Sequence, residues 1–526
     1  MRNTTIRILT ALLLCFALCL PLAVVSQANE ELSAEAADES AGGKEDNSFF
    51  GKVNFWDTEV WEFIVAMSTL LAAIMLANIL RTKVPFVRRL LIPSSVLGGL
   101  ILLAIAGIWR IFSDEPLFDR VLMEELTYHG LGLGFAAMTL KNTEKKRYSN
   151  GLTDSLNSGL TVVGTYLIQS IIGLFITLTL SYVLFSENVK TYALGILTSL
   201  GYGQGPGQAY NWGNNYEVTY GFTHGSSFGL TLAALGFISA SIGGIIYLNI
   251  LRRKGRLKGV AEERSAEPKL EDFTGKNEVP HSESLDKMTI QVALVFIAYF
   301  IAYAFMSAIN AIIDAGWLGD FGYNTLRPLL WGFNFLFAML AAMLVKAVLR
   351  FLRRKNIMKR EYTNDFLQNR LSGFFFDIMV VASIAAIDLS AFAYPEFVIP
   401  LALCAAAALV ITFIYDNIIC RKLFPDYRDE AFLSLFGMLT GTASTGIILL
   451  REKDPNFETP ASDNLVTLQP FAIAFGFPML LLLPYAAQSK TAAWIIDLIL
   501  VALFVVINLI LFRKFIFKKK KKDKTK

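Results

Sequence analysis

The sequence predicts an all-α polytopic membrane protein, made of two five-helix repeats of inverted topology, each with a re-entrant hairpin, and one extra C-terminal helix. Two observations lead to this prediction: the composition, and the alternation of apolar runs with charged loops. Of the 526 residues, 54% are hydrophobic and only 17% are charged, whereas a soluble domain has about 25% charged residues. Most of the chain is therefore expected to lie in a bilayer.

Apolar stretches of roughly 20 residues are long enough to cross a bilayer, and the sequence holds eleven of them. They are 59–80, 90–112, 121–140, 152–185, 222–251, 288–314, 326–350, 371–390, 396–416, 464–486 and 491–512. The stretches 121–140 and 371–390 are the weakest of the eleven. Two further segments, 191–210 and 429–450, are apolar but are interrupted by small and polar residues.

The first 28 residues resemble a signal peptide or a signal anchor. Arg2 and Arg7 precede an apolar run, and Ser-Gln-Ala before Asn29 resembles a cleavage site. Residues 29–58 carry many acidic side chains and are expected to form an extracytoplasmic segment.

The charges of the loops predict the topology. Basic loops stay in the cytoplasm, and the sequence has six basic clusters, among them RRKGRLK at 252–258 and the tail RKFIFKKKKKDKTK at 513–526. All six lie in the cytoplasm only if 191–210 and 429–450 enter the membrane and return on the same side. Both segments are therefore predicted to be re-entrant. The protein is expected in the cell (inner) membrane, with its N-terminal segment outside and its basic C-terminus in the cytoplasm.

The two halves of the chain repeat one order of elements: two strong spans, a weak span, a strong span, an interrupted segment and a closing span. The repeats are 59–251 and 288–490, joined by a cytoplasmic linker at 252–287, and residues 491–526 add one helix and the tail. Because five crossings is an odd number, the second repeat runs in the opposite sense. Inverted repeats with interrupted segments in matching positions are typical of secondary transporters.

The interrupted segment of the first repeat holds the first set of candidate substrate-binding residues. Glycine lets the backbone bend and approach a ligand, and amide side chains both donate and accept hydrogen bonds. The candidates are Gly203, Gln204, Gly205, Gly207 and Gln208. The alternative is that small residues here only allow helices to pack closely.

The interrupted segment of the second repeat is rich in hydroxyl groups, which together with unwound backbone carbonyls suit Na⁺. The candidates are Thr440, Gly441, Thr442, Ser444 and Thr445. Alternatively, these hydroxyl groups bond to their own helix. Arg451 is a candidate to pair with a substrate carboxylate, or it is only a positive residue at the cytoplasmic end.

Secondary candidates lie in two of the predicted spans. Asp377 and Asp388 are three helical turns apart in 371–390 and so share about one face. Carboxylates within a membrane are functional candidates, although both lie near the helix ends, where water solvates them. Asn157 and Gln169 in 152–185 are expected to form hydrogen bonds between helices.

Enzyme functions are poorly supported by the sequence. GSSFG at 225–229 matches the G-x-S-x-G pattern, but no predicted strand precedes it, and no Walker A motif is present. The four Cys and three His have no metal-ligand spacing. The chain is therefore expected to be neither an enzyme nor a nucleic-acid-binding protein, and its basic tail is expected to contact anionic lipid.

Residues 201–244, GYGQGPGQAYNWGNNYEVTYGFTHGSSFGLTLAALGFISASIGG, resemble the bacterial sodium/glutamate symporter family. Shorter matches are IPSSVLGGL at 92–100, GLGFAAMTL at 132–140 and FGMLTGTASTGIILL at 436–450. The resemblance implies a homodimer in which a transport part of each protomer carries a small anionic or zwitterionic solute with Na⁺, in an elevator-like movement. No cofactor other than Na⁺ is implied.

The first hairpin departs from this family's pattern. Where the family has Gly-Gly-His-Gly-Thr, this chain has Gly-Tyr-Gly-Gln-Gly-Pro-Gly-Gln. The expected substrate is therefore glutamate or a related small carboxylate or amino acid.

A proton-coupled carboxylate transporter is the alternative, with Asp377 or Asp388 as the titrating group. A channel would need a symmetric polar ring and a membrane sensor a cytoplasmic output domain, and the sequence predicts neither.

Overall fold

The computed structural model describes residues 58–113, 116–141, 151–185, 189–257, 286–358, 360–455, 457–513 and 515. The predicted signal segment 1–28, nearly all of the acidic segment 29–58, most of the linker 252–287 and the end of the basic tail lie outside these residues. All regular secondary structure in the described part of the chain is helical.

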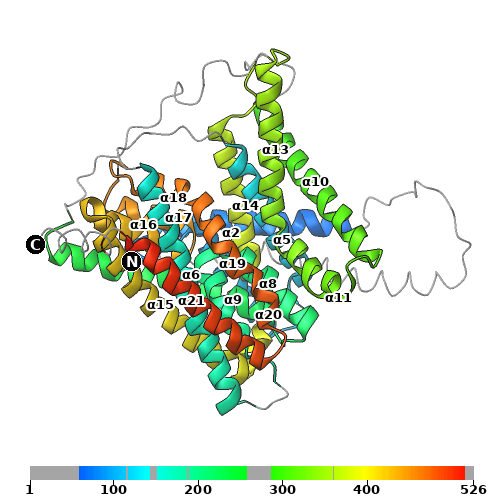
Figure 1. Cartoon of the computed structure of the whole chain (residues 1–526). Helices are drawn as coiled ribbons and strands as arrows, with labels where there is room; N and C mark the ends of the chain where they lie inside the picture. The colour runs from blue at the N-terminus through cyan, green and yellow to red at the C-terminus, as the bar shows by residue number, and fades with distance from the viewer. Residues whose placement is uncertain are drawn as a thin grey trace, which may run out of the picture.

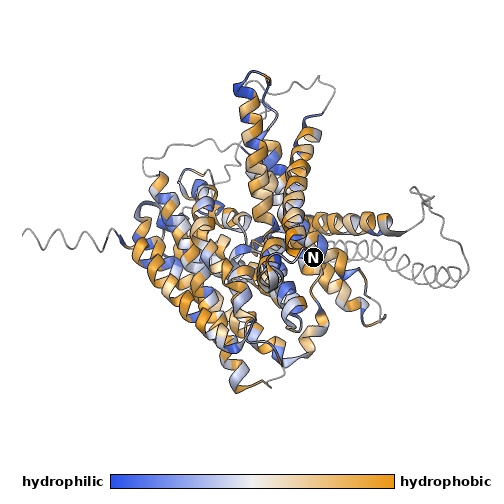
Figure 2. Cartoon of the chain, turned by 45° about the vertical axis from the view of Figure 1, so that its right-hand side comes forward, coloured by the Kyte–Doolittle hydropathy of each residue, from blue (hydrophilic) through white to orange (hydrophobic). Residues whose placement is uncertain are grey.

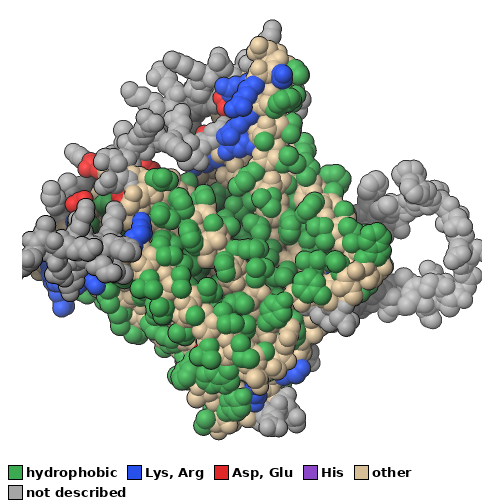
Figure 3. All heavy atoms as spheres, viewed as in Figure 1, with side chains coloured by type: hydrophobic (Ala, Val, Ile, Leu, Met, Phe, Trp, Pro, Cys, Tyr) green, Lys and Arg blue, Asp and Glu red, His purple; other side chains and the backbone are tan. Residues whose placement is uncertain are grey.

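Eight helices of the described chain are long and apolar enough to cross a membrane. Apolar residues run along most of their length (Figure 2), and apolar side chains cover much of the face seen in Figure 3, as a surface in contact with lipid tails requires. The eight are α2 (Thr58–Lys83), α6 (Gly151–Val183), α9 (Gly225–Arg253), α10 (Lys287–Asp314), α13 (Asn334–Arg354), α15 (Pro395–Leu423), α19 with α20 (Gln469–Leu481 and Leu483–Ala486) and α21 (Lys490–Leu511). The protein is an integral membrane protein whose described part is all-helical.

Three predicted spans are helices that are not among these eight. The helix α4 (Ser94–Trp109) has 16 residues; at 1.5 Å per residue it measures about 24 Å, less than the ~30 Å apolar core of a bilayer. The helices α5 (Arg120–Leu140) and α14 (Asp365–Ala385) are longer but carry several charged residues. Whether these three helices cross the membrane stays a prediction.

Two predicted boundaries are wrong. The span predicted at 371–390 is α14, which begins earlier because the Asn364 side chain caps it by accepting a hydrogen bond from the Leu367 N–H. Because α14 ends at Ala385, Asp388 lies beyond it. The segment predicted as a hairpin at 191–210 ends inside a helix, since α8 begins at Pro206 and continues to Tyr220, where Gly221 with φ 73° closes it. That this segment is re-entrant stays a prediction.

The helices form two groups. The α5–α14 group consists of α2, α4, α5, α10, α13 and α14: α5 packs against α13 and α14, α4 against α2 and α14, and α10 against α13. In Figure 1, α10 and α13 extend from α5 and α14 at one side of the molecule. Short elements complete this half: α3 (Pro85–Arg89), α11 (Gly319–Phe321), η5 (Gly322–Leu326) and α12 (Arg327–Gly332).

The hairpin group consists of α6, α9, α15, α19, α20, α21 and two broken helical segments. The first broken segment is η2 (Leu194–Ile196), α7 (Leu197–Ser199), η3 (Leu200–Gln204) and α8 (Pro206–Tyr220); the second is α16 (Arg428–Thr440) and α17 (Ala443–Arg451). The closing helix α9 packs against α15, and α19 packs against α6. The short elements η7 (Pro425–Tyr427) and α18 (Ala461–Thr467) connect helices of this group, and η6 (Leu389–Ala393) joins α14 to α15.

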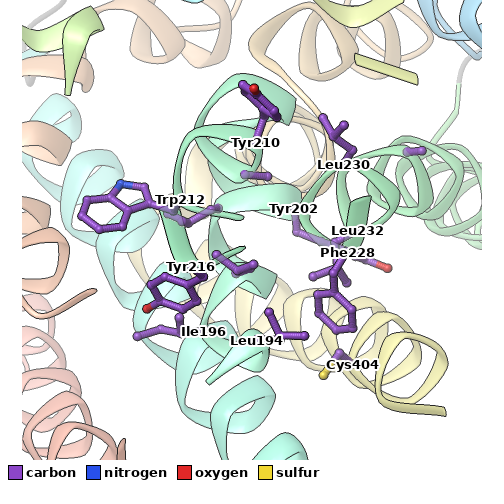
Figure 4. Close-up of a cluster of buried hydrophobic side chains, with 14 of the residues drawn as sticks. Leu194, Ile196, Tyr202, Tyr210, Trp212, Tyr216, Phe228, Leu230, Leu232 and Cys404 are labelled. Atoms are coloured by element: carbon purple, nitrogen blue, oxygen red, sulfur yellow. The ribbon is translucent and has the colours of Figure 1, made fainter. Parts of the chain in front are cut away.

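The helix α8 lies where the two groups meet. It packs against α5, α12 and α14 on one side, and against α9 and η3 on the other. Large buried rings hold it there: Figure 4 shows Trp212 and Tyr216 of α8 on one side of the buried cluster, and Phe228 of α9 on the other side. The Tyr216 hydroxyl donates to the Leu483 carbonyl at 2.7 Å, and the ring centroids of Trp212 and Phe333 are 5.5 Å apart. A segment with a polar sequence is thus fixed by a few large side chains.

Candidate functional site

The first helix break is at Gly205, between η3 and α8. Its backbone has φ 92° and ψ 176°, a combination that is essentially confined to glycine. Pro206 follows as the first residue of α8, where its missing N–H costs nothing because the first amides of a helix have no intrahelical partner. The chain therefore stops one helix and starts another within two residues.

The second helix break is at Gly441 and Thr442, between α16 and α17. Thr442 has an extended backbone, with φ −141° and ψ 170°, and precedes the first turn of α17. Gly441 has φ −149° and ψ −106°, which is neither helical nor extended. The carbonyl of Thr442 accepts a hydrogen bond from Gly446 N at 3.0 Å. Unlike Gly205, these two residues do not have a positive φ.

The two breaks meet inside the hairpin group. A β-carbon at Gly205 would lie 3.7 Å from Cγ2 of Thr442, and η3 packs against α16. The segments are more than 230 residues apart in the sequence, so this meeting comes from the tertiary fold. Four helix ends therefore lie close together, and each has backbone N–H or carbonyl groups without an intrahelical hydrogen-bond partner.

The helix α6 bonds to both broken segments through adjacent turns. The Tyr166 hydroxyl donates to the Gly203 carbonyl at 3.1 Å, and a β-carbon at Gly203 would lie 2.3 Å from the Tyr166 ring. Gln169 Nε2 donates to the Leu439 carbonyl at 3.0 Å and to Thr412 Oγ1 at 2.8 Å. The prediction that Gln169 forms hydrogen bonds between helices is confirmed.

The predicted residues of the first segment surround its break. Gln208 is 2% exposed, and neither its Nε2 nor its Oε1 has a hydrogen-bond partner among the described residues. Gln204 is half-buried. Gly207 faces the α5–α14 group, since a β-carbon there would lie 2.8 Å from Leu131 of α5. The first segment thus holds a buried amide with unused hydrogen-bonding capacity.

The predicted residues of the second segment differ in what they bond. The Thr440 hydroxyl donates to the Phe436 carbonyl of its own helix at 2.6 Å, which is the structural alternative that the sequence left open. The hydroxyl oxygens of Thr442 and Thr445 are 3.4 Å apart. Ser444 is exposed, and Gly441 is buried.

Arg451 and Asn157 lie away from the breaks. Arg451 is the last residue of the nine-residue α17, about 12 Å along the helix from its start, and its guanidinium stacks over the Phe457 ring at 5.3 Å. Asn157 is more than two turns from Tyr166 on α6, and its Oδ1 accepts from Arg513 at 3.4 Å. The structure does not bring either residue to the candidate site.

Asp377 and Asp388 do not share a helix face, contrary to the prediction. Asp377 lies on an exposed face of α14. Asp388 follows α14 and caps η6, with its Oδ2 3.1 Å from Nη1 of Arg120 and its Oδ1 3.6 Å from Arg110. Burial alone would raise the pKa of Asp388, but hydrogen bonds from Ser390 and the two guanidinium groups outweigh burial and lower this pKa below its usual value.

Arg120 also connects the α5–α14 group with the hairpin group. Its Nη2 donates to the hydroxyl of Ser226 at 3.0 Å, and Ser226 in turn donates to Glu217 at 2.7 Å. Ser226 belongs to α9 and Glu217 to α8, whereas Arg120 begins α5. This contact between the groups is charged, while the neighbouring contact at Gly207 is apolar. The GSSFG sequence that includes Ser226 lies within α9.

The sequence predictions missed Tyr166, Thr412 and Asp416. Tyr166 and Thr412 have no distinguishing sequence signal, because their roles come from packing against the broken segments. Asp416 had a signal: it is a single acidic residue in the apolar run LVITFIYDNII at 409–419.

A scan against protein-family models and a search of curated protein sequences found no match for this chain.

Proposed function

We propose that this protein is a secondary active transporter that couples the movement of glutamate, or of a related small carboxylate or amino acid, to that of Na⁺. One observation carries the proposal: two breaks from distant parts of the chain, at Gly205 and Thr442, lie in contact within the hairpin group. Discontinuous helices expose helix ends and unwound carbonyls, which bind anionic groups and cations in secondary transporters. The unpartnered amide of Gln208 adds a donor and an acceptor for a polar solute.

An inverted repeat is part of the proposal, and the helix packing supports it. In order, the first half has α2, α4, α5, α6, a broken segment and α9; the second has α10, α13, α14, α15, a broken segment and α19. The third helices, α5 and α14, pack against each other, and each closing helix packs against the fourth helix of the other half. Such reciprocal packing is what a two-fold relation between the halves produces. In this reading both broken segments are re-entrant hairpins.

The movement would be elevator-like, with the hairpin group sliding against the α5–α14 group. The apolar contact of Gly207 with Leu131 permits sliding, whereas the Arg120–Ser226 contact has to break in each cycle.

The exposed apolar side chains of α10 and α13, such as Phe300 and Leu344, are suited to lipid or to a second copy of the chain, so a homodimer belongs to the proposal.

The orientation follows from the loop charges. We place the protein in the cell (inner) membrane with the basic ends of α9 and α13 in the cytoplasm, since both helices end in arginine pairs. Basic side chains gather at the end of α13 in Figure 3. This orientation puts the acidic segment 29–58 outside and the basic tail in the cytoplasm, next to anionic lipid.

The experiment is uptake by the purified protein in liposomes. Labelled L-glutamate, followed by a panel of small carboxylates and amino acids, would be offered with and without an inward Na⁺ gradient. Accumulation of any of these solutes that needs the Na⁺ gradient is the expected result. Accumulation driven by a proton gradient instead would support the proton-coupled alternative, and no accumulation under either gradient would contradict the transporter proposal.

A further inference from the structure

A fully buried polar seam lies between α6 and α15. On α6, Thr165 and Gln169 are four residues apart; on α15, Thr412 and Asp416 have the same spacing. Thr165 Oγ1 is 2.8 Å from Asp416 Oδ1, and Gln169 Nε2 is 2.8 Å from Thr412 Oγ1. The two pairs follow each other along antiparallel helices, about one turn or 6 Å apart.

The carboxylate in this seam is shielded from solvent. Asp416 is 0% exposed, and the other three side chains are at most 1% exposed. Oδ2 of Asp416 and Oε1 of Gln169 have no hydrogen-bond partner within the described part of the chain. No Lys, Arg or His described here forms an ion pair with Asp416. A buried carboxylate without a counter-charge is strongly disfavoured.

The hydroxyl beside Asp416 is also shared. Thr165 Oγ1 is 2.9 Å from the Thr161 carbonyl as well as 2.8 Å from Asp416 Oδ1. Because a hydroxyl has one proton, it donates to only one of these oxygens at a time. The protein therefore supplies at most one donor to this carboxylate, and either a proton or a cation has to neutralise it. A proton would serve Asp416 alone, whereas Gln169 Oε1 also lacks a partner among the described residues, so the two oxygens together favour a cation.

The available ligands identify the type of cation. The seam presents a carboxylate, two threonine hydroxyls and an amide oxygen, and oxygen ligands suit hard cations. No group of three or more His, Cys, Asp or Glu side chains is present in the described residues. A single carboxylate neutralises a monovalent ion, whereas a divalent ion would leave a net charge buried in the seam.

The seam is connected to both helix breaks. Gln169 bonds to the Leu439 carbonyl, three residues before Thr442, and Tyr166 on the same face of α6 bonds to the Gly203 carbonyl. A cation beside Thr165 and Gln169 would therefore fix the side chains that hold both broken segments. We propose that Asp416 is the anionic ligand of the Na⁺ site, with Thr165 beside it, and that Na⁺ bound there organises the hairpins for the solute. This inference rests on the proposed Na⁺-coupled transport.

The test is Na⁺ binding by the purified full-length protein in detergent. The unfolding midpoint would be followed while NaCl replaces choline chloride at constant ionic strength, since a ligand that binds only the folded state raises that midpoint. The wild type is expected to show a saturable rise. The Asp416→Asn variant should need at least tenfold more Na⁺ for the same rise. Asp497→Asn is the matched control: Asp497 is 6% exposed, lies in α21, and has no hydrogen bond to either broken segment.

Two results would overturn the inference: a wild type without a Na⁺-dependent rise, or an Asp416→Asn variant that follows the wild type. If Asp416→Asn does not fold, Thr165→Val provides the second test, because it keeps the volume and removes the hydroxyl. It should weaken Na⁺ binding about threefold or more, and unchanged binding would also contradict the proposal.

The two proposals fail in different ways. If the wild type accumulates solute under a Na⁺ gradient, and Asp416→Asn does so with the same Na⁺ dependence, the assignment of Asp416 is wrong and the proposed function stands. If the wild type accumulates no solute under any gradient, the proposed function fails. Na⁺ binding in detergent is measured without transport and still tests Asp416 in that case.

Discussion

Both broken segments end one helix and begin another within a few residues, but they do so with different chemistry. The first break depends on backbone conformation, because Gly205 has φ 92° and ψ 176°, and its neighbour Gln208 keeps an unpartnered amide. The second break has negative φ angles at both Gly441 and Thr442 and an extended backbone at Thr442. The hydroxyls of Thr440, Thr442 and Thr445 bond within the segment. The comparison indicates that the first segment is fixed by its backbone conformation and keeps an amide with unused hydrogen-bonding groups. The second segment is fixed by local hydrogen bonds.

The largest effect on stability and uptake is expected from a substitution at Gly205. Gly205→Ala forces a β-carbon into a backbone region that costs on the order of 1–3 kcal/mol, although space is available because the nearest atom to that β-carbon is 3.7 Å away. The variant should lower the unfolding midpoint and abolish uptake in liposomes.

The control for this variant is Gly373→Ala in α14. A β-carbon at Gly373 would have nothing within 4 Å, and alanine favours a helix by roughly 0.5–1 kcal/mol over glycine. This variant should be as stable as the wild type or slightly more stable, with normal uptake. Equal behaviour of the two variants would show that the conformation at Gly205 is not essential.

The second effect is expected at Gln208, where stability and transport should change in opposite directions. A buried polar group without a partner costs about 1–3 kcal/mol, so Gln208→Leu should raise the unfolding midpoint. If the amide binds solute, the same variant should raise the KM for uptake at least tenfold. A variant that is more stable and transports normally would assign Gln208 no role in binding.

A smaller effect is expected in the second segment. Thr445→Val removes a hydroxyl that faces Thr442, whereas Thr440→Val removes one that bonds its own helix. Thr445→Val should raise the KM for uptake a few-fold, and Thr440→Val should leave it within twofold. Both substitutions keep the side-chain volume, so the ratio of the two KM values separates a ligand role from local bonding. The reverse order would mean that Thr440 faces the ligand.

The smallest effect is expected at Arg451. Arg451→Ala removes a stacking contact over Phe457, and an exposed contact of this kind contributes about 0.5–1 kcal/mol. The KM for uptake should stay within twofold of the wild type. A tenfold rise in KM would mean that Arg451 reaches the solute in a conformation other than the one described.

The breaks were predictable from the sequence, because clusters of polar residues and glycine interrupt helices. One apolar stretch has glycines with amide side chains, and the other has glycines with hydroxyl side chains. The positions of the eight long apolar helices of the described chain were predictable from apolar length. The partners of Gln169 and the unpartnered amide of Gln208 were not predictable, since both depend on how segments far apart in the sequence pack.

Asp416 shows how much depends on where a helix ends. It was the last residue of the predicted span 396–416, and no role was assigned to it from the sequence. In the structure α15 continues to Leu423 and α6 covers that turn, so Asp416 is buried. Asp388 shows the reverse: the sequence put it inside a helix, and it lies in a connection beside Arg120. A shift of a few residues in a helix boundary thus changes the surroundings of a carboxylate completely.

The central claim is that both breaks contribute to one binding site, and cysteine labelling tests it most directly. In a chain without the native cysteines, Gln204→Cys and Ser444→Cys would each be labelled with a maleimide, since Gln204 is half-buried and Ser444 is exposed. The transported solute with Na⁺ should slow labelling at both positions, with the same half-saturating solute concentration. Protection of only one position, or protection at clearly different concentrations, would contradict a single shared site.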